Sequence, residues 1–256
     1  MERRQWVKAI GAVSLGALGG CADEDDSTAP ETDGEPADSP TTVSDTHQRA
    51  PAEPALPPPG TVEGEQSVAT AIGNRRSRRE YGPEPLTAAE LGQLLWAAQG
   101  TTKRRVGRQD LRAAPSAGAT YPLELFVVIG DPGVEGFEAG VYHYDRDDHA
   151  LELVTGGAHQ AELQAIAVDQ AWVGAAALNI VVTGVNERTT DRYGQRGRER
   201  YVPMEVGHVG QNIYLQAESL GLSTVAIGAF RDADLRALLE VSDAHRPLCL
   251  YPVGRR

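Results

Sequence analysis

The sequence predicts a folded domain of mixed helices and strands, of the α+β or the α/β class, behind an N-terminal stretch of different character. Two observations carry this prediction. Apolar side chains recur at steps of three and four over residues 202–220, and β-branched runs such as residues 123–129 are typical of buried strands. Helical and extended segments interleave along the chain, which leaves both classes open. Residues 66–256 are numerous enough for one domain with a core of its own.

The first expected helix covers residues 66–74, where the helical pattern is weak, and two prolines interrupt the chain after it. A capping box then starts a second helix, because the Thr87 side chain can accept from the amide of Glu90 while the Glu90 carboxylate reaches back. Leucines continue this helix at helical spacing, and Gly100 ends it. The polar, arginine-rich residues 101–111 are expected to form a surface loop.

In the second half of the domain, apolar runs alternate with turn-forming residues. The polar residues 145–149 separate two strands of an expected hairpin, and Gly221 is the stop signal of the longest helix. The remaining expected elements are strands over residues 123–129, 141–144, 150–154, 177–183, 223–227 and 248–253, and helices over residues 159–168, 202–220 and 232–239. We find no internal repeat.

Residues 1–21 have the pattern of a twin-arginine lipoprotein signal peptide. Arg3 and Arg4 stand before an apolar pair and a lysine, and residues 9–20 are mildly apolar and too short to span a bilayer. The stretch ends in Leu-Gly-Gly-Cys at Cys21, which resembles a lipobox; the alternative is a chance cysteine after small residues. We therefore expect export and anchoring to the cell envelope through lipid on Cys21.

Residues 22–65 predict a disordered, acidic, proline-rich tether. Residues 22–70 contain 12 acidic side chains against Arg49 alone, which accounts for most of the chain's net charge of −12. The absence of a basic patch argues against a nucleic-acid partner. The histidines show no metal-ligand spacing, and no phosphate-binding glycine motif is present. Besides Cys21, the chain has only Cys249, expected to be a buried, inert thiol.

Residues 75–79 are the first candidate ligand site. Four arginines and Ser77 occupy five positions beside a helix, and guanidinium groups bind phosphate through paired, charge-assisted hydrogen bonds. The residue types alone also allow a solvated basic surface loop.

Residues 114–128 are the second candidate. Pro115 and Pro122 fix the backbone at two points, and Gly118 permits a backbone angle that other residues avoid, before an apolar strand begins. Such a loop can hold amide groups and the Ser116 hydroxyl against a flat ligand. The alternative is an ordinary tight turn.

Two strings give the sequence a family resemblance. Residues 115–124, P-S-A-G-A-x-Y-P-L-E, and residues 75–81, R-R-S-x-R-x-Y, resemble the FMN-dependent nitroreductase superfamily, in its thiazoline/oxazoline-dehydrogenase-like branch. The likeness runs from about residue 67 to the C-terminus. It implies an α+β fold with a central, mostly antiparallel sheet flanked by helices, and a two-fold homodimer with FMN at the interface.

The resemblance also implies which residues contact FMN. Arg75 and Ser77 match the phosphate side, Arg79 matches the pyrimidine end of the flavin, and Arg76 is a further contact. The loop that contacts FMN from the partner subunit is matched by Pro115, Ser116, Ala117 and Gly118. The loop at the edge of the flavin ring is matched by Ile227 and Gly228, and Arg255 matches a C-terminal contact to the phosphate.

The implied activity is that of an FMN-dependent oxidoreductase. It transfers a hydride in a ping-pong cycle between NAD(P)H or another donor and a small organic acceptor, such as a quinone, a nitroaromatic or an envelope substrate. FMN carries the chemistry, so no catalytic residue is assigned; Tyr201 and His208 are candidates for proton transfer.

Two alternatives stay open. One is an azoline (thiazoline or oxazoline) dehydrogenase of a peptide-modification pathway, whose relatives use a Lys-Tyr pair; the matching pair here is Arg200-Tyr201, and arginine is a poor proton-transfer group. The other is a non-catalytic flavin-binding lipoprotein. FMN content together with NAD(P)H oxidation separates these classes.

Overall fold

The structure is a computed structural model that describes residues 55–256. These residues all belong to one compact unit, Gln48–Arg256. The expected signal peptide, Cys21 and most of the acidic segment lie outside the described residues. Within the described part, no helix combines the length and apolar character needed to cross a membrane.

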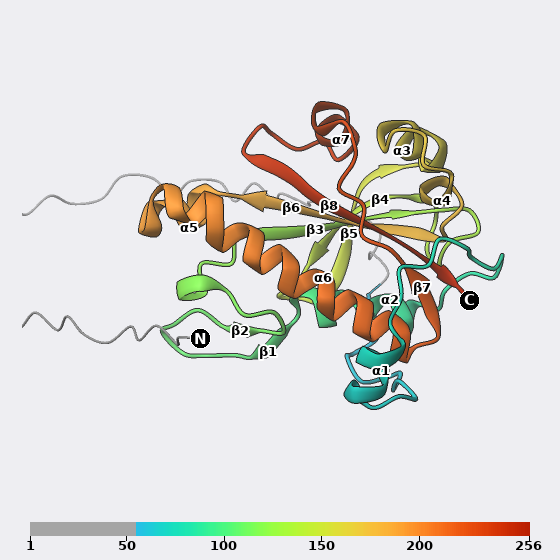
Figure 1. Cartoon of the computed structure of the whole chain (residues 1–256), viewed down its shortest axis with the longest axis horizontal. Coiled ribbons are helices and arrows are strands. Elements are labelled where there is room, and N and C mark those ends of the chain that lie inside the picture. Colours follow the sequence, from blue (N-terminus) through green and yellow to red (C-terminus); the bar gives the residue numbers. More distant parts are fainter. Residues whose placement is uncertain (1–54) are drawn as a thin grey trace, which may run out of the picture. The chain divides into compact units, whose positions relative to one another are not determined.

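A six-stranded sheet forms the centre of the domain (Figure 1). Every neighbouring pair of strands is antiparallel, so the class is α+β and not α/β. The strands, in spatial order, are β5 (Ala150–Gly156), β4 (Gly140–Asp145), β3 (Leu123–Ile129), β6 (Leu178–Val185), β8 (His245–Arg255) and β7 (Leu222–Thr224).

Helices cover both faces of this sheet, which explains why β3 and β6 are buried along almost their whole length. Side chains alternate between the two faces: Leu125 and Val127 belong to one core cluster, Phe126 and Val128 to the other. The first cluster is closed by α2 (Ala88–Gln99) and α6 (Val202–Ser219). The second is closed by α3 (Gln160–Ile166), α4 (Ala171–Gly174) and α7 (Asp232–Leu238).

Several expected elements are confirmed. The capping box at Thr87 and Glu90 is present in full, with the Glu90 amide on Thr87 Oγ1 and the Thr87 amide on Glu90 Oε2. Ser67 caps α1 (Val68–Asn74), and the apolar stripe of residues 202–220 forms α6, with Leu220 as its C-cap.

Other expectations are wrong or incomplete. The predicted strand over residues 223–227 ends at Thr224, because the Ala226 amide donates to a side chain, Tyr214 Oη, and only Ile227 rejoins the sheet, as a single bridge to Leu250. The expected loop over residues 101–111 contains a two-stranded sheet, β1 (Thr101–Lys103) with β2 (Leu111–Arg112).

The short helix α4 was not predicted, nor were two elements between β6 and α6. These are α5 (Glu187–Tyr193) and a wide π-helical turn, Gly197–Tyr201, that runs directly into α6. The candidate loop contains a 3₁₀ turn, Ala117–Ala119.

Glu124 on β3 ties the sheet to α5. Its buried carboxylate binds Arg146 at 2.9 Å, Arg188 of α5, and His143 at 3.3 Å. Burial alone would raise the pKa of Glu124, but the hydrogen bond from His143 and the charges of Arg146 and Arg188 outweigh it and hold that pKa at about 2. The same hydrogen bond raises the pKa of His143.

Replacing Glu124 with Gln should therefore destabilise the domain by about 2–3 kcal/mol at neutral pH. Removing one partner of a buried pair costs roughly 3–5 kcal/mol, and this is reduced because the arginines keep some solvent access. Glu124 has a lowered folded pKa, so its stabilisation is complete above its unfolded value and is lost as the pH falls towards about 2.

Urea unfolding across acidic and neutral pH measures this effect. The acid-dependent loss of stability should be smaller in Glu124→Gln than in the wild type. Glu152→Gln, which removes an exposed partner of His143, is the matched control and should change stability by less than about 0.5 kcal/mol. Equal acid sensitivity in wild type and Glu124→Gln would show that this carboxylate does not carry the effect.

Candidate functional site

The predicted site residues gather in two places along α6. The first, which we call the arginine cluster, is the segment of residues 75–79 with a cavity of about 470 Å³ lined by Ser77, Arg78, Arg79, Glu80, Ser223 and Arg256. The second, which we call the α6 pocket, is a cavity of about 280 Å³ lined by Pro115, Ser116, Ala117, Tyr201, Met204, Glu205 and His208.

The arginines of the first group fall into two kinds. Arg78, at 2.6 Å, and Arg256 both bind the buried carboxylate of Glu218 near the end of α6. Arg255 binds Glu90, with 2.8 Å between Nη2 and Oε2, and also donates to the Pro85 carbonyl. The charges of these three guanidinium groups are therefore already paired with carboxylates of the same chain.

Arg75 and Arg79 are different, since neither forms an ion pair within residues 55–256. Arg75 stacks over the ring of Tyr214 at 5.1 Å, and Arg79 over the ring of Trp172 at 5.3 Å. Arg76 donates to the carbonyls of Gly73 and Arg75. The stacking orients two cations without neutralising them, which leaves their charge available to an anion.

Tyr214, which the sequence reasoning did not select, joins two predicted contact segments. Its Oη accepts from the Ala226 amide at 2.8 Å and also shares a hydrogen bond with Ser77 Oγ at 2.9 Å. The Arg78 amide also donates to the Thr224 carbonyl. The segments 75–79 and 224–228, far apart in sequence, thus lie side by side.

Ile227 and Gly228 take different positions in this loop. Ile227 is buried and exchanges two backbone hydrogen bonds with Leu250, which fixes the loop to β8. A Cβ at Gly228 would meet no atom within 4 Å, so the space beside its backbone is open.

The α6 pocket has a rigid wall made by residues 115–118. The Pro115 carbonyl accepts from His208 Nδ1 at 3.2 Å, and Ser116 Oγ accepts from the Tyr121 amide at 2.9 Å. Gly118 has φ of +60°, and a Cβ there would lie 2.4 Å from Tyr193 Oη. The left-handed backbone angle therefore favours glycine, and any other residue would also displace the Tyr193 side chain.

Both candidates for proton transfer line the α6 pocket. Tyr201 ends the π-helical turn, and its ring packs edge-on against Tyr193, with 4.9 Å between centroids. A carbonyl only accepts, so the bond to Pro115 places a proton on His208 Nδ1 and leaves Nε2 as an acceptor when the ring is neutral.

Glu205 is a second side chain that the sequence reasoning missed as a site residue. It is buried at the base of the α6 pocket, where Gln99 Nε2 donates to its Oε1 at 3.2 Å. The signal was present in the sequence: Val202, Glu205 and Val209 stand at helical spacing, so Glu205 occupies a position of the apolar stripe.

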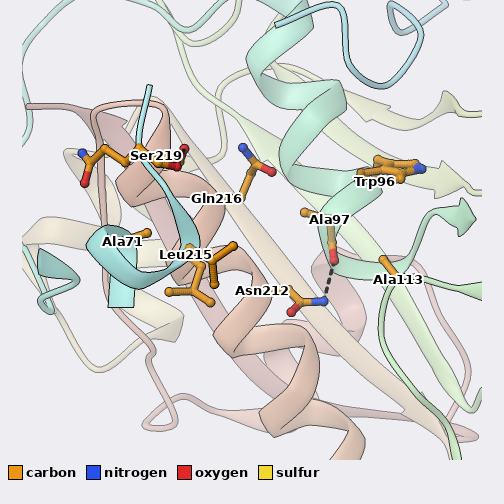
Figure 2. A pocket seen from close by; sticks show the side chains of 10 residues that line it. Ala71, Trp96, Ala97, Ala113, Asn212, Leu215, Gln216 and Ser219 are labelled. Carbon is orange, nitrogen blue, oxygen red and sulfur yellow. Dashed lines mark hydrogen bonds between the residues drawn. The ribbon is translucent and has the colours of Figure 1, made fainter. Parts of the chain in front are cut away.

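A third cavity, of about 240 Å³, lies between α1, α2 and α6 (Figure 2). Asn212 Nδ2 closes one side by donating to the Ala97 carbonyl at 2.9 Å. None of the predicted site residues lines it. Beside it, α1 exposes the apolar side chains of Val68 and Ile72.

The arginine cluster and the α6 pocket do not meet within one chain. Glu205 in the pocket and Glu218 at the cluster are 13 residues apart on the same straight element, which corresponds to about 20 Å along a helix. Within residues 55–256, no group of three or more histidine, cysteine or acidic side chains is arranged to hold a metal ion.

An antiparallel sheet between two helical layers, with two arginines that form no ion pair in the described part of the chain and a shaped Pro-Ser-Ala-Gly loop, defines a small-molecule-binding α+β enzyme domain. The nitroreductase family model matches residues 72–255. The chain therefore belongs to the nitroreductase family, and it is an oxidoreductase of that family.

Individual relatives agree with this assignment. The nitroreductase-family protein MJ1384 of Methanocaldococcus jannaschii is 46% identical over 182 residues, which covers 71% of this chain and 87% of the relative. The crystal structure of a nitroreductase-type protein from Ralstonia eutropha is 27% identical with a TM-score of 0.66, and the match covers 78% of this chain and 88% of that one.

A more distant likeness is to a peptide-processing protein. The microcin B17-processing protein McbC of Escherichia coli is 31% identical over 125 residues, which is 48% of this chain and 46% of McbC. This chain thus matches less than half the length of that relative.

We predict that Tyr214→Phe uncouples the two segments of the arginine cluster. The Ala226 amide loses its acceptor, so its hydrogen exchange should accelerate, and the domain should lose about 1–2 kcal/mol of unfolding free energy. Tyr193→Phe is the matched control, since the Tyr193 hydroxyl makes no hydrogen bond within residues 55–256. Unchanged protection of Ala226 in Tyr214→Phe would contradict the assignment.

Proposed function

We propose that the protein is an FMN-dependent oxidoreductase that transfers a hydride between NAD(P)H or another donor and a small organic acceptor, such as a quinone, a nitroaromatic or an unidentified envelope substrate. The observation that carries the proposal is the contrast among the arginines. Arg78, Arg255 and Arg256 are ion-paired, whereas Arg75 and Arg79 are oriented by aromatic rings and form no ion pair within residues 55–256.

The residues of the arginine cluster fit the charged part of FMN. A phosphate needs cationic and hydroxyl donors, and Arg75 and Ser77 supply these, while Arg79, beside a cavity of about 470 Å³, supplies a cation for the pyrimidine end of the flavin. The open space at Gly228 suits a flat ring lying against the backbone. FMN, when bound, supplies the hydride chemistry; the protein supplies the phosphate anchor, a cation and a shaped surface.

The site is completed by a second copy of the chain in this proposal. The Pro115–Gly118 segment lies at the far end of α6 from the arginine cluster, so it cannot reach the same ligand within one chain. A two-fold axis between two chains can place the Pro115–Gly118 segment of one chain beside the arginine cluster of the other. The symmetry then gives the dimer two equivalent sites. The exposed apolar side chains of Val68, Ile72 and Met204, on α1 and α6, support a buried interface there.

The azoline dehydrogenase remains the second candidate, because relatives such as McbC are peptide-processing proteins. The position that would supply the basic member of the pair is Arg200, and arginine is a poor proton-transfer group. The reductase therefore remains our first candidate.

For localisation we propose export by the twin-arginine route with FMN bound, followed by lipid anchoring at Cys21. The support is the sequence of residues 1–21 alone. A single acyl chain gives only marginal anchoring, so the proposal includes more than one chain on Cys21.

We predict that the purified full chain binds one FMN per subunit and that Arg75→Ala with Ser77→Ala weakens binding by about 100-fold or more. Each charge-assisted hydrogen bond contributes roughly 1.5–3 kcal/mol, so the loss of two has this size. Fluorescence titration of FMN measures the dissociation constant. Arg231→Ala on α7, an exposed arginine paired with Asp234, is the control. The same affinity in the double variant and the wild type would remove the arginine cluster as the phosphate site.

A mixed dimer tests whether sites are shared. One chain carries Arg75→Ala with Ser77→Ala, and the other carries Ala117→Asp, which places a carboxylate at the wall of the α6 pocket. Each homodimer should fail to bind FMN, whereas the differently tagged heterodimer should bind about one FMN, because one of its two sites is built from two intact halves. An FMN-free heterodimer would instead place both halves of each site in one chain.

The localisation proposal predicts two different failures. Replacing Arg3 and Arg4 with lysines should leave the precursor in the cytoplasm, and Cys21→Ala should release or misprocess the exported protein. Cell fractionation and mass spectrometry of the mature N-terminus measure both. Normal arrival of the Lys-Lys variant at the envelope would refute the export route.

A further inference from the structure

Trp172 of α4 carries an unsatisfied N–H group. Its Nε1 is buried and makes no hydrogen bond within residues 55–256, although the side chain as a whole is only partly buried against the second core cluster. A buried donor without an acceptor destabilises a folded protein, whereas phenylalanine at the same place would have no such group. The polar edge of the indole therefore gains nothing here, and what tryptophan contributes is its broad aromatic face.

That face carries a cation. The Arg79 guanidinium lies over the Trp172 ring, with 5.3 Å between Cζ and the ring centroid. The Arg79 side chain makes no hydrogen bond and no ion pair within the described residues. Tryptophan attracts a cation over its ring more strongly than phenylalanine or tyrosine does. In the described part of the chain, the indole is thus the contact that orients this guanidinium.

The helix that presents Trp172 is fixed on both sides of it. Gln170, the N-cap of α4, donates to the Ala229 carbonyl at 3.1 Å. The buried Asn179 of β6 donates to the Val173 carbonyl at 3.1 Å. A helix of a single turn has little stability of its own, so these tertiary contacts hold α4, and with it the indole, in place.

The position of α4 is also tied to the predicted flavin-edge loop. Gln170 links α4 to the loop of residues 224–230, and the same loop is bound from α6, because the Ala226 amide donates to Tyr214 Oη at 2.8 Å. The Tyr214 ring carries the Arg75 guanidinium. Each of the two arginines that form no ion pair within residues 55–256 is therefore held by an aromatic ring from an element that also binds this loop.

We propose that Trp172 is a positioning residue that holds the Arg79 guanidinium beside α4 and the 224–230 loop, and so determines how strongly this cation acts on the flavin. That the group facing Arg79 is FMN rests on the proposed function. Reduced FMN carries more negative charge than oxidised FMN at neutral pH, so a fixed cation stabilises the reduced form more. An arginine released from the indole samples more positions, and its effect on the flavin weakens.

The first measurement needs no cofactor. NMR of the full chain with ¹³C-labelled arginine follows the Cδ protons of Arg79, and Arg79→Gln identifies them by the loss of their signal. The ring current of the indole should shift these protons upfield in the wild type. Trp172→Leu should return them to the positions of a solvated arginine, and Trp172→Phe should keep part of the shift. Identical signals in the wild type and Trp172→Leu would overturn the contact.

The second measurement compares the dissociation constants of reduced and oxidised FMN. In Trp172→Leu the preference for reduced FMN should fall by about fivefold, the size of one exposed cation–π contact, which lowers the midpoint potential of this two-electron couple by about 20 mV. Arg79→Gln should lower the preference at least as much, and the double variant should fall no further than Arg79→Gln. Trp172→Phe should restore most of the preference.

The matched control is Trp96→Leu. Trp96 of α2 is also half-buried, but no arginine lies over its ring within the described residues, so this variant should keep the wild-type preference. Additive losses in the double variant would show that Trp172 supports the fold without acting through Arg79, and would overturn the proposal. If Trp172→Leu does not fold, Trp172→Phe against the wild type gives the comparison, since its weaker face should reduce both readouts together.

The outcomes are separable. A wild type that binds FMN but has the same preference as Trp172→Leu sinks this proposal and leaves the proposed function intact. Failure of the wild type to bind FMN sinks the proposed function, and the Arg79 proton shifts then decide by themselves whether Trp172 positions this arginine.

Discussion

Ion pairs between buried glutamates and arginines are the interaction on which the packing of this domain depends. Glu90 ties the start of α2 to Arg255 at the end of β8, and Glu124 ties β3 to β4 and α5. Glu218 ties α6 to Arg78 and to the C-terminal Arg256. Each pair joins elements distant in sequence, and removal of one partner would leave a charge with little solvent to receive it.

The same pairing decides which cations are left for a ligand. Seen in sequence, the arginines of residues 75–79 are equivalent, and so are the two at the C-terminus. In the structure, Glu218 and Glu90 neutralise three of them, and aromatic rings orient Arg75 and Arg79 without neutralising them. The assignment of Arg75 to the phosphate and of Arg79 to the pyrimidine end of the flavin is thus supported by which arginines the carboxylates already bind. For Arg255 the predicted phosphate contact stays a prediction, made by a side chain that already holds Glu90.

Much of the fold could be predicted from local signals, and the misses have physical causes. The capping box and the apolar stripe of α6 encode their helices directly, and the β-branched runs encode the central strands. The π-helical turn before α6 has three charged residues between a glycine and a tyrosine and no apolar periodicity, so no pattern marked it. The early end of β7 depends on a hydrogen bond from Ala226 to Tyr214, a tertiary contact that no local pattern contains. The site segments were found through family resemblance, whereas Tyr214 and Glu205 became visible only through their partners.

The π-helical turn at Gly197–Tyr201 gives the α6 pocket a property of its own. Its hydrogen bonds skip one residue more than those of an α-helix, so it stores one extra residue at the entrance of α6. Deleting a residue there would convert the turn to α-helix and rotate everything before it by about 100° relative to α6. Tyr193, which precedes the turn and packs against Tyr201, would be displaced, while Tyr201, Glu205 and His208 would keep their places on α6. Insertion or deletion in the turn can therefore change what packs behind Tyr201 separately from the pocket residues that α6 carries.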